Sequence, residues 1–118
     1  MERLTNKEEE IMQALWELQK GFVKDILALL PNESHYNTIS TMVRNLEEKG
    51  YVAHQAFGKT HQYFPIVSKE EYAKGFMNFA TKRFFDNSYK SMVSFFAKEE
   101  KISAEELREI LDIIEKKQ

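Results

Sequence analysis

The chain has 118 residues, which is enough for one ordinary domain or two small supporting lobes and too few for a large catalytic cleft. Hydrophobic residues make up 42% of it and charged residues 31%, a composition that indicates a globular, helix-rich protein and excludes a disordered one. Its formal net charge is -2 and it has no cysteine, which excludes disulfides, thiolate metal sites and cysteine nucleophiles.

Three helices are predicted in the first 50 residues. Thr5 and Glu8 have the spacing of a capping box, so the first helix should run from about 5 to 19 and end before Gly21. A short second helix ends at Pro31, and a third begins near Tyr36 and ends at Gly50. Their apolar positions recur at helical spacing: Ile11, Met12, Leu15 and Trp16, then Val23, Ile26, Leu27 and Leu30, then Ile39, Met42, Val43 and Leu46.

A β-hairpin should follow these helices. The segments YVAHQAF and HQYFPIV are rich in β-branched and aromatic residues, and they flank a short turn at residues 58–60. Pro65 suits an edge strand, because it has no N–H to donate to a neighbouring strand. Three helices and a hairpin in this order predict a winged helix-turn-helix domain over residues 1–67.

The second half, residues 68–118, should be a helical dimerisation domain. Capping boxes at Ser68 and Ser103 predict helix starts near 69 and 104, and residues 86–88 can begin another helix running from about 88 to 98. Six of the nine phenylalanines fall between residues 76 and 96. Since this segment can form only a thin core alone, we expect a homodimer. The predicted interface residues, with Tyr72 and Ala80 as further apolar positions, are Phe76, Phe79, Tyr89, Met92, Val93, Phe96, Leu107, Ile110, Leu111 and Ile114.

The outer face of the third helix carries the predicted reading residues. Opposite its apolar stripe lie short hydrogen-bonding side chains, which can meet base edges in the major groove, and one arginine, which can reach a phosphate or a guanine. An ordinary solvated face has the same composition, but the position of this helix directly before a hairpin favours DNA reading. The face comprises Asn37, Thr38, Ser40, Thr41 and Arg44, with Asn45 and Glu48 beside them.

Lys59 and His61 lie at the tip and far side of the predicted hairpin, where a wing would touch the DNA backbone or minor groove. A lysine in a polar turn is equally typical of a soluble surface. Neither half of the chain is basic: there are 7 Lys and Arg against 9 Asp and Glu up to Val67, and 10 against 10 after it. Affinity for phosphate must therefore come from local placement and from duplication in a dimer.

No enzyme site, cofactor or metal site is predicted. The three histidines do not have metal-ligand spacing, and the four glycines are too scattered to form a phosphate loop. The carboxylates of residues 8–10 suit the first turn of a helix. No apolar run approaches the about 18 to 20 residues that span a membrane, and the first residues lack the apolar core of a signal peptide. We therefore expect a cytoplasmic protein with no direct membrane insertion.

Four segments together resemble the penicillinase and methicillin-resistance repressor family (BlaI/MecI): LTNKEEEIMQALW, NTISTMVRNLEEKGYV, GKTHQYFPIVSKEEY and ISAEELREILDII. The resemblance runs from Leu4 to about Glu115. It implies a bacterial, dimeric winged-helix repressor that binds a double-stranded DNA operator with dyad symmetry. The base-reading positions that it implies are Asn37, Thr38, Ser40 and Thr41.

The resemblance also implies a mode of induction. In the resistance branch of the family, a membrane sensor with a metalloprotease triggers cleavage of the repressor in its dimerisation helices. The matching stretch here is 93–96, which places the predicted cleavage between Ser94 and Phe95. The alternative function for the whole chain is a winged-helix module that binds another protein and no specific DNA.

Overall fold

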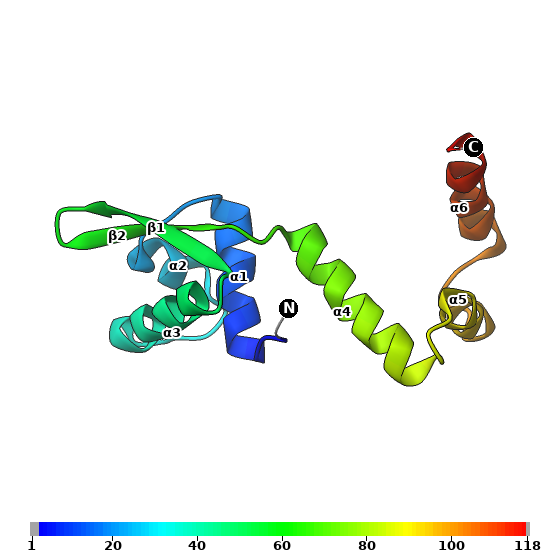
Figure 1. Ribbon diagram of the computed structural model, residues 1–118, viewed down its shortest axis with the longest axis horizontal. Coiled ribbons are helices and arrows are strands. Elements are labelled where there is room, and N and C mark those ends of the chain that lie inside the picture. The colour runs from blue at the N-terminus through cyan, green and yellow to red at the C-terminus, as the bar shows by residue number, and fades with distance from the viewer. Residues whose placement is uncertain (1–2, 118) are drawn as a thin grey trace. The chain divides into compact units, whose positions relative to one another are not determined.

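The computed structural model describes residues 3–117, and within them the chain forms six helices and one antiparallel β-hairpin (Figure 1). The predicted fold class, mainly α with a small hairpin, is confirmed. By its internal contacts the chain divides into two compact units, one ending at Phe76 and the other beginning at Met77.

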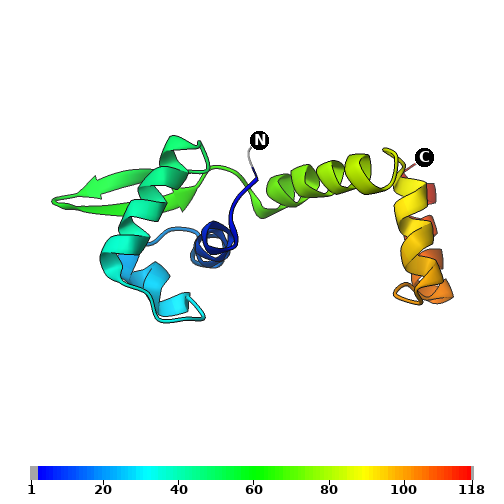
Figure 2. The same cartoon turned by 90° about the horizontal axis from the view of Figure 1, so that it is seen from below.

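The first unit has the element order of a winged helix. Helices α1 (Asn6–Leu18), α2 (Val23–Leu29) and α3 (Tyr36–Glu48) precede strands β1 (Val52–Phe57) and β2 (Thr60–Pro65). The turn of the hairpin projects beyond the three helices in both views (Figures 1 and 2). Its core combines all five elements and consists of Leu4, Ile11, Met12, Ala14, Leu15, Val23, Ile26, Ile39, Val43, Leu46, Tyr51, Val52 and Tyr63.

The start of α1 is fixed by the predicted capping box. The Thr5 hydroxyl accepts from the Glu8 N–H at 3.2 Å, and the Glu8 carboxylate accepts from the Thr5 N–H at 2.9 Å. The other Glu8 oxygen lies 2.7 Å from the Lys49 ammonium, just after α3. Burial raises the pKa of Glu8, but its hydrogen bonds with Lys49 and Thr5 outweigh burial and hold that pKa below its usual value. One charged pair therefore joins the beginning of α1 to the end of α3.

The end of α3 is a Schellman motif. Gly50 adopts a φ of 86°, a left-handed conformation that costs glycine little. Its N–H donates to the Glu47 carbonyl at 3.0 Å, and the Tyr51 N–H donates to the Leu46 carbonyl at 3.0 Å. The chain thus turns sharply from the helix into β1, with the Tyr51 side chain buried behind it.

The hairpin turn is tighter than the sequence predicts. Thr60 already pairs with Phe57, so only Gly58 and Lys59 form the loop. Gly58 has a φ of 62° at the position where type II′ hairpin turns take glycine.

β2 is an edge strand of a two-stranded sheet, as Pro65 predicts, but it has one further backbone partner. Its residue Tyr63 exchanges two backbone hydrogen bonds with Gly21, at 2.9 and 2.8 Å. The segment between α1 and α2 therefore forms an isolated bridge beside β2. Pro65 lies two residues beyond this bridge, where it interrupts no pairing with Gly21.

The first turns of α4 (Lys69–Phe84) belong to the first unit. The Tyr72 hydroxyl donates to the Glu9 carboxylate and accepts from the Leu4 N–H at 3.3 Å, while its ring lies 5.9 Å from that of Trp16. Burial and the Glu9 carboxylate raise the pKa of Tyr72 to about 12, so this phenol stays a neutral donor. Tyr72, one of the apolar positions of the second half of the sequence, thus packs against the core of its own winged helix.

The second unit contains the rest of α4, α5 (Tyr89–Lys98) and α6 (Ala104–Lys116). Asp86 and Asn87 take positive φ angles of 51° and 61° in the turn before α5, and Ser88 and Ser103 cap the two helices that follow. Among the described residues of this unit, Thr81 alone is buried, and α5 and α6 have no buried side chain. This unit therefore has helical structure almost without a core of its own.

Replacing Glu8 by glutamine should test the pair that joins α1 to α3. Glutamine keeps an oxygen that can accept from Thr5 but loses the charge that faces Lys49, so we expect the free energy of unfolding at pH 7 to fall by about 1 to 2 kcal/mol. Because folding lowers the pKa of Glu8, its contribution is complete above about pH 4.5 and is lost as the pH falls through the lowered value.

Urea titrations at neutral and acidic pH would measure this difference. It should shrink as the pH falls, whereas Glu17→Gln, on an exposed site of the same helix, should change stability by less than about 0.5 kcal/mol at either pH. A Glu8→Gln variant as stable as the original protein at pH 7 would contradict the assignment.

Candidate nucleic-acid interface

One face of α3 packs into the core through apolar side chains, and the opposite face is left to solvent. Ile39, Val43 and Leu46 are each 0% exposed, so the helix cannot rotate about its axis without exposing them. The predicted reading residues lie on the remaining surface. Ser40 is half-buried at the edge of this face, and the exposed residues are Asn37, Thr38, Thr41 and Arg44.

The side chains on this face are already connected to one another. The Thr41 hydroxyl donates to the Asn37 carbonyl at 3.0 Å and accepts from the Arg44 guanidinium at 3.3 Å. Its proton is therefore committed to the helix backbone, and the Thr41 methyl group is the part free to meet another surface. The same contact holds the Arg44 side chain along the helix, one turn beyond Thr41.

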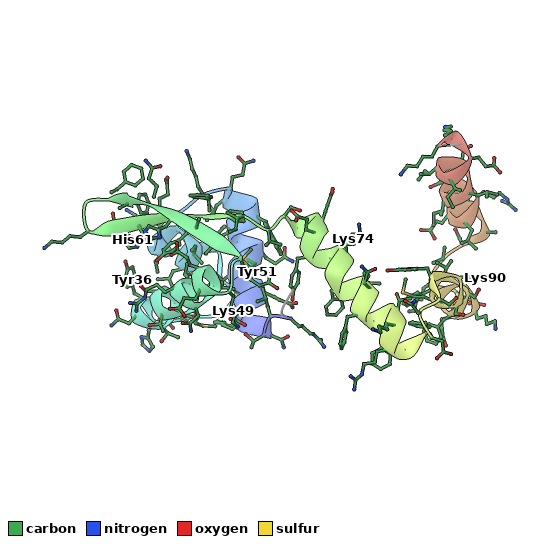
Figure 3. All side chains as sticks on the ribbon, in the orientation of Figure 1. Tyr36, Lys49, Tyr51, His61, Lys74 and Lys90 are labelled. Atoms are coloured by element: carbon green, nitrogen blue, oxygen red, sulfur yellow. The ribbon has the colours of Figure 1, made fainter. Side chains whose placement is uncertain are left out.

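The two predicted wing residues have different surroundings. Lys59 is exposed in the hairpin turn, whereas His61 is half-buried and stacks face to face on His54, with ring centroids 4.0 Å apart. The Nδ1 atom of His54 lies 2.8 Å from the Glu47 carboxylate on α3. Figure 3 labels Tyr36 near the start of α3 and His61 on the hairpin. The hairpin is thus tied to α3 at its base and is free at its turn.

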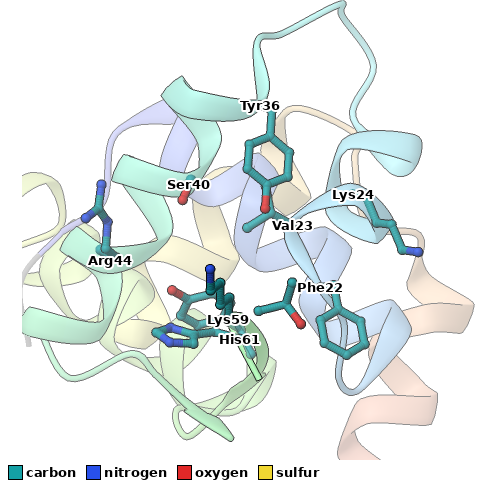
Figure 4. Close-up of a pocket in the computed structure, with 10 residues that line it drawn as sticks. Phe22, Val23, Lys24, Tyr36, Ser40, Arg44, Lys59 and His61 are labelled. Atoms are coloured by element: carbon teal, nitrogen blue, oxygen red, sulfur yellow. The ribbon is translucent and has the colours of Figure 1, made fainter. Parts of the chain in front are cut away.

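A pocket of about 410 Å³ opens between α2, α3 and the hairpin (Figure 4). It brings together four of the predicted residues, Ser40 and Arg44 from α3 with Lys59 and His61 from the hairpin. Asn37, Thr38 and Thr41 are not among the residues that line it.

The sequence analysis does not assign several polar residues of this pocket, among them Lys24, Tyr36 and Thr60. In the sequence Lys24 follows Val23 in an ordinary amphipathic pattern, and Tyr36 only marks the beginning of a helix. No local signal in the sequence shows that α2 contributes to the surface on which α3 and the hairpin meet.

The comparisons with known proteins agree with this architecture. Residues 4–116 match the family described as penicillinase repressors. The chain belongs to this family. It is thus a winged-helix transcriptional repressor of the BlaI/MecI type.

Curated relatives align over nearly the whole length of both chains. The penicillinase repressor of Bacillus licheniformis is 26% identical over 115 residues, which cover 96% of this chain and 90% of that protein. The methicillin resistance regulatory protein MecI of Staphylococcus aureus strain N315 is 25% identical over 120 residues, covering 97% and 94% respectively. MecI of Mammaliicoccus sciuri shows the same identity and coverage. These relatives are regulatory proteins.

In this member of the penicillinase repressor family, the carboxylate run at the start of α1 has structural partners. Glu8 binds Lys49, Glu9 accepts from Tyr72, and Glu10 lies 3.8 Å from the Lys7 ammonium. Across residues 3–117 no three histidine or carboxylate side chains are grouped so that they could hold a metal ion. In the same range, no helix is both long and apolar enough to cross a membrane.

The predicted interface residues of the second half lie on three helices and are largely exposed. Phe76 belongs to the first unit, where the Arg3 guanidinium lies 4.9 Å above its ring, and Phe79 follows one turn later on α4. Met92 and Leu107 are half-buried. The others are 37 to 53% exposed: Tyr89, Val93, Phe96, Ile110, Leu111 and Ile114. The predicted cleavage residues, Ser94 and Phe95, lie inside α5.

Proposed function

We propose that this repressor acts as a homodimer on a double-stranded DNA operator with dyad symmetry. Each copy would place α3 in a major groove, with Asn37, Thr38, Ser40 and Thr41 against base edges and Arg44 against a phosphate or guanine. Lys59 and His61 on the hairpin would contact the adjacent backbone. By occupying a promoter in the bacterial cytoplasm, the dimer would block transcription.

The nearly coreless second unit carries the dimer proposal. Its helices expose Phe96 at 37%, Ile110 at 43% and Leu111 at 53%, although each lies on the apolar face of its helix. A monomer would leave these apolar side chains in water, and burying them against the same residues of a second copy removes that cost. The segment 68–118 would then be the dimerisation domain, and residues 1–67 the DNA-binding domain.

Dimerisation would also supply affinity that one copy lacks. The winged-helix half has no surplus of positive charge, so its contacts with phosphate are few. Two copies double these contacts and hold the two reading helices at one fixed spacing, about 34 Å for successive major grooves on one side of a duplex.

We propose further that induction is proteolytic. A membrane sensor with a metalloprotease would trigger cleavage between Ser94 and Phe95 and so destroy the dimer interface. Both residues lie within α5, so cleavage requires this helix to open locally. The absence of buried side chains among the described residues of α5 makes this opening inexpensive in the monomer.

The proposal is tested by selecting duplexes from a random-sequence pool with the full chain. Dyad-symmetric sequences should be enriched, and their affinity should fall steeply between about 50 and 200 mM salt, in proportion to the number of phosphates neutralised. Failure to retain any duplex at low salt would instead support the alternative, a winged-helix module that binds another protein.

Thr41 provides the sharpest test of the reading face. Thr41→Ala removes the exposed methyl group and should weaken binding to the selected duplex by about 1 to 3 kcal/mol while leaving the melting temperature nearly unchanged. Thr41→Val is the matched control, because it keeps a methyl group and, like the alanine variant, loses the hydroxyl that bonds the Asn37 carbonyl and Arg44. It should retain more affinity than the alanine variant. An alanine variant that binds as well as the original protein would show that Thr41 does not face the bases.

Phe96→Asp tests the dimer and its link to DNA binding together. A charge placed within an apolar interface should dissociate the dimer and abolish operator binding in the same variant. Light scattering and duplex titration measure the two effects. Phe96→Leu, which keeps an apolar side chain, and Ser91→Asp, which adds a charge elsewhere on α5, should retain both properties. A Phe96→Asp protein that is still dimeric and still bound to operator would refute the assigned interface.

A further inference from the structure

The pocket between α2, α3 and the hairpin gathers positive charge in a protein that has no excess of it. Lys24, Arg44 and Lys59 all line the pocket, and His61 lies in the same wall. Among the described residues that line it, none is acidic. Figure 4 shows Lys59 reaching from the hairpin toward Ser40 and Tyr36, with Arg44 on one side and Lys24 on the other. Three separate elements thus contribute cationic residues to the lining of one pocket.

Two carboxylates near this pocket along the chain are already engaged. Asp25 accepts the Phe22 N–H at 2.9 Å at the start of α2, and Glu47 is held by His54 at 2.8 Å. Within the described part of the chain, neither Lys24 nor Lys59 forms an ion pair. The two ammonium groups are therefore available to an external anion without breaking any internal bond.

The pocket also offers the hydroxyl groups of Tyr36 and Ser40, whereas the Thr60 hydroxyl already donates to the Phe57 carbonyl at 2.8 Å. Hydroxyl and cationic donors that converge from several directions suit a tetrahedral anion with several acceptor oxygens. Its position adds a second constraint, since Ser40 and Arg44 stand both on its wall and on the predicted reading face. A duplex contacted by α3 would carry one of its strands past the mouth of the pocket.

We propose that this pocket is a seat for one phosphate group of the DNA backbone, with Lys24 of α2 as a DNA contact beside Arg44 and Lys59. The inference rests on the proposed function, and it assigns to α2 a role in holding the duplex. It also explains how a chain with a net charge of -2 can hold DNA, because its available cations are concentrated where one phosphate lies.

The test uses the full chain and a duplex selected by the original protein, with single backbone phosphates replaced one at a time by neutral methylphosphonates. At one position in each half-site, the replacement should weaken binding by about tenfold, as expected for a charge-assisted contact. In the double variant Lys24→Gln, Lys59→Gln, the same replacement should weaken binding by less than about twofold, because the cations that it faced are gone. The slope of affinity against salt should also become shallower by about 1 or more.

Lys69→Gln is the matched control, since it removes one charge from an exposed lysine that does not line the pocket. It should leave both the methylphosphonate pattern and the salt slope unchanged. Circular dichroism would show that all variants are folded, which is expected because the substituted lysines are exposed.

Three results would overturn the proposal or its basis, and they are distinguishable. If the double variant binds every methylphosphonate duplex more weakly by the same factor, DNA binding stands but the pocket does not hold a phosphate of the backbone. The pocket binds a free anion instead if two results are found together. Adding inorganic phosphate alone shifts the NMR signals of Tyr36 and Lys59 saturably, and no methylphosphonate position loses its effect in the double lysine variant. If no duplex is selected at all, the proposed function fails before this question arises.

Discussion

The burial of one apolar stripe on α3 determines what the rest of the first unit can present to a partner. Ile39, Val43 and Leu46 are inaccessible to solvent, and the motif at Gly50 ends the helix at a fixed point, so both the rotation and the length of α3 are set by packing. The exposed face and the start of β1 follow from these two constraints. The Glu8–Lys49 pair reinforces them by joining the end of α3 to the start of α1.

Local signals predicted the fold of this chain well, since capping and periodicity act over a few residues. The boxes at Thr5, Ser68 and Ser103 each lie where a helix begins, and the winged-helix order was evident from the hairpin that follows the third helix. What the sequence could not show depends on contacts between distant segments. The bridge from Gly21 to Tyr63, the bond from Tyr72 to Glu9 and the place of Lys24 beside α3 and the hairpin all join residues that are far apart in the chain, so no local pattern predicts them. The exposed face of α3 was predicted correctly, while the DNA contacts assigned to it stay predictions.

The two units differ in how they obtain their stability. The first has a core to which three helices, both strands and Tyr51 contribute, and it also fixes the first turns of α4 through Tyr72. The second places its apolar side chains on helix faces that its own residues do not cover. If a second copy covers them, folding of this half and assembly are one process, and its stability depends on protein concentration. A repressor of this kind would lose DNA affinity at low abundance through its helical half, with its reading helix still intact.

Gly21 lies outside the hairpin, in the loop between α1 and α2, but a substitution there would affect the hairpin. A Cβ atom there would lie 3.1 Å from Leu18 Cδ1 and 3.3 Å from Asp25 Cβ, while the backbone on either side must stay paired with Tyr63. Even alanine would push against the end of α1 and the first turn of α2 at once. Because Asp25 holds that turn and Tyr63 anchors β2, the disturbance would reach both walls of the cationic pocket. The position of the hairpin against α1 and α2 therefore depends on the absence of a side chain at Gly21, in the loop between these two helices.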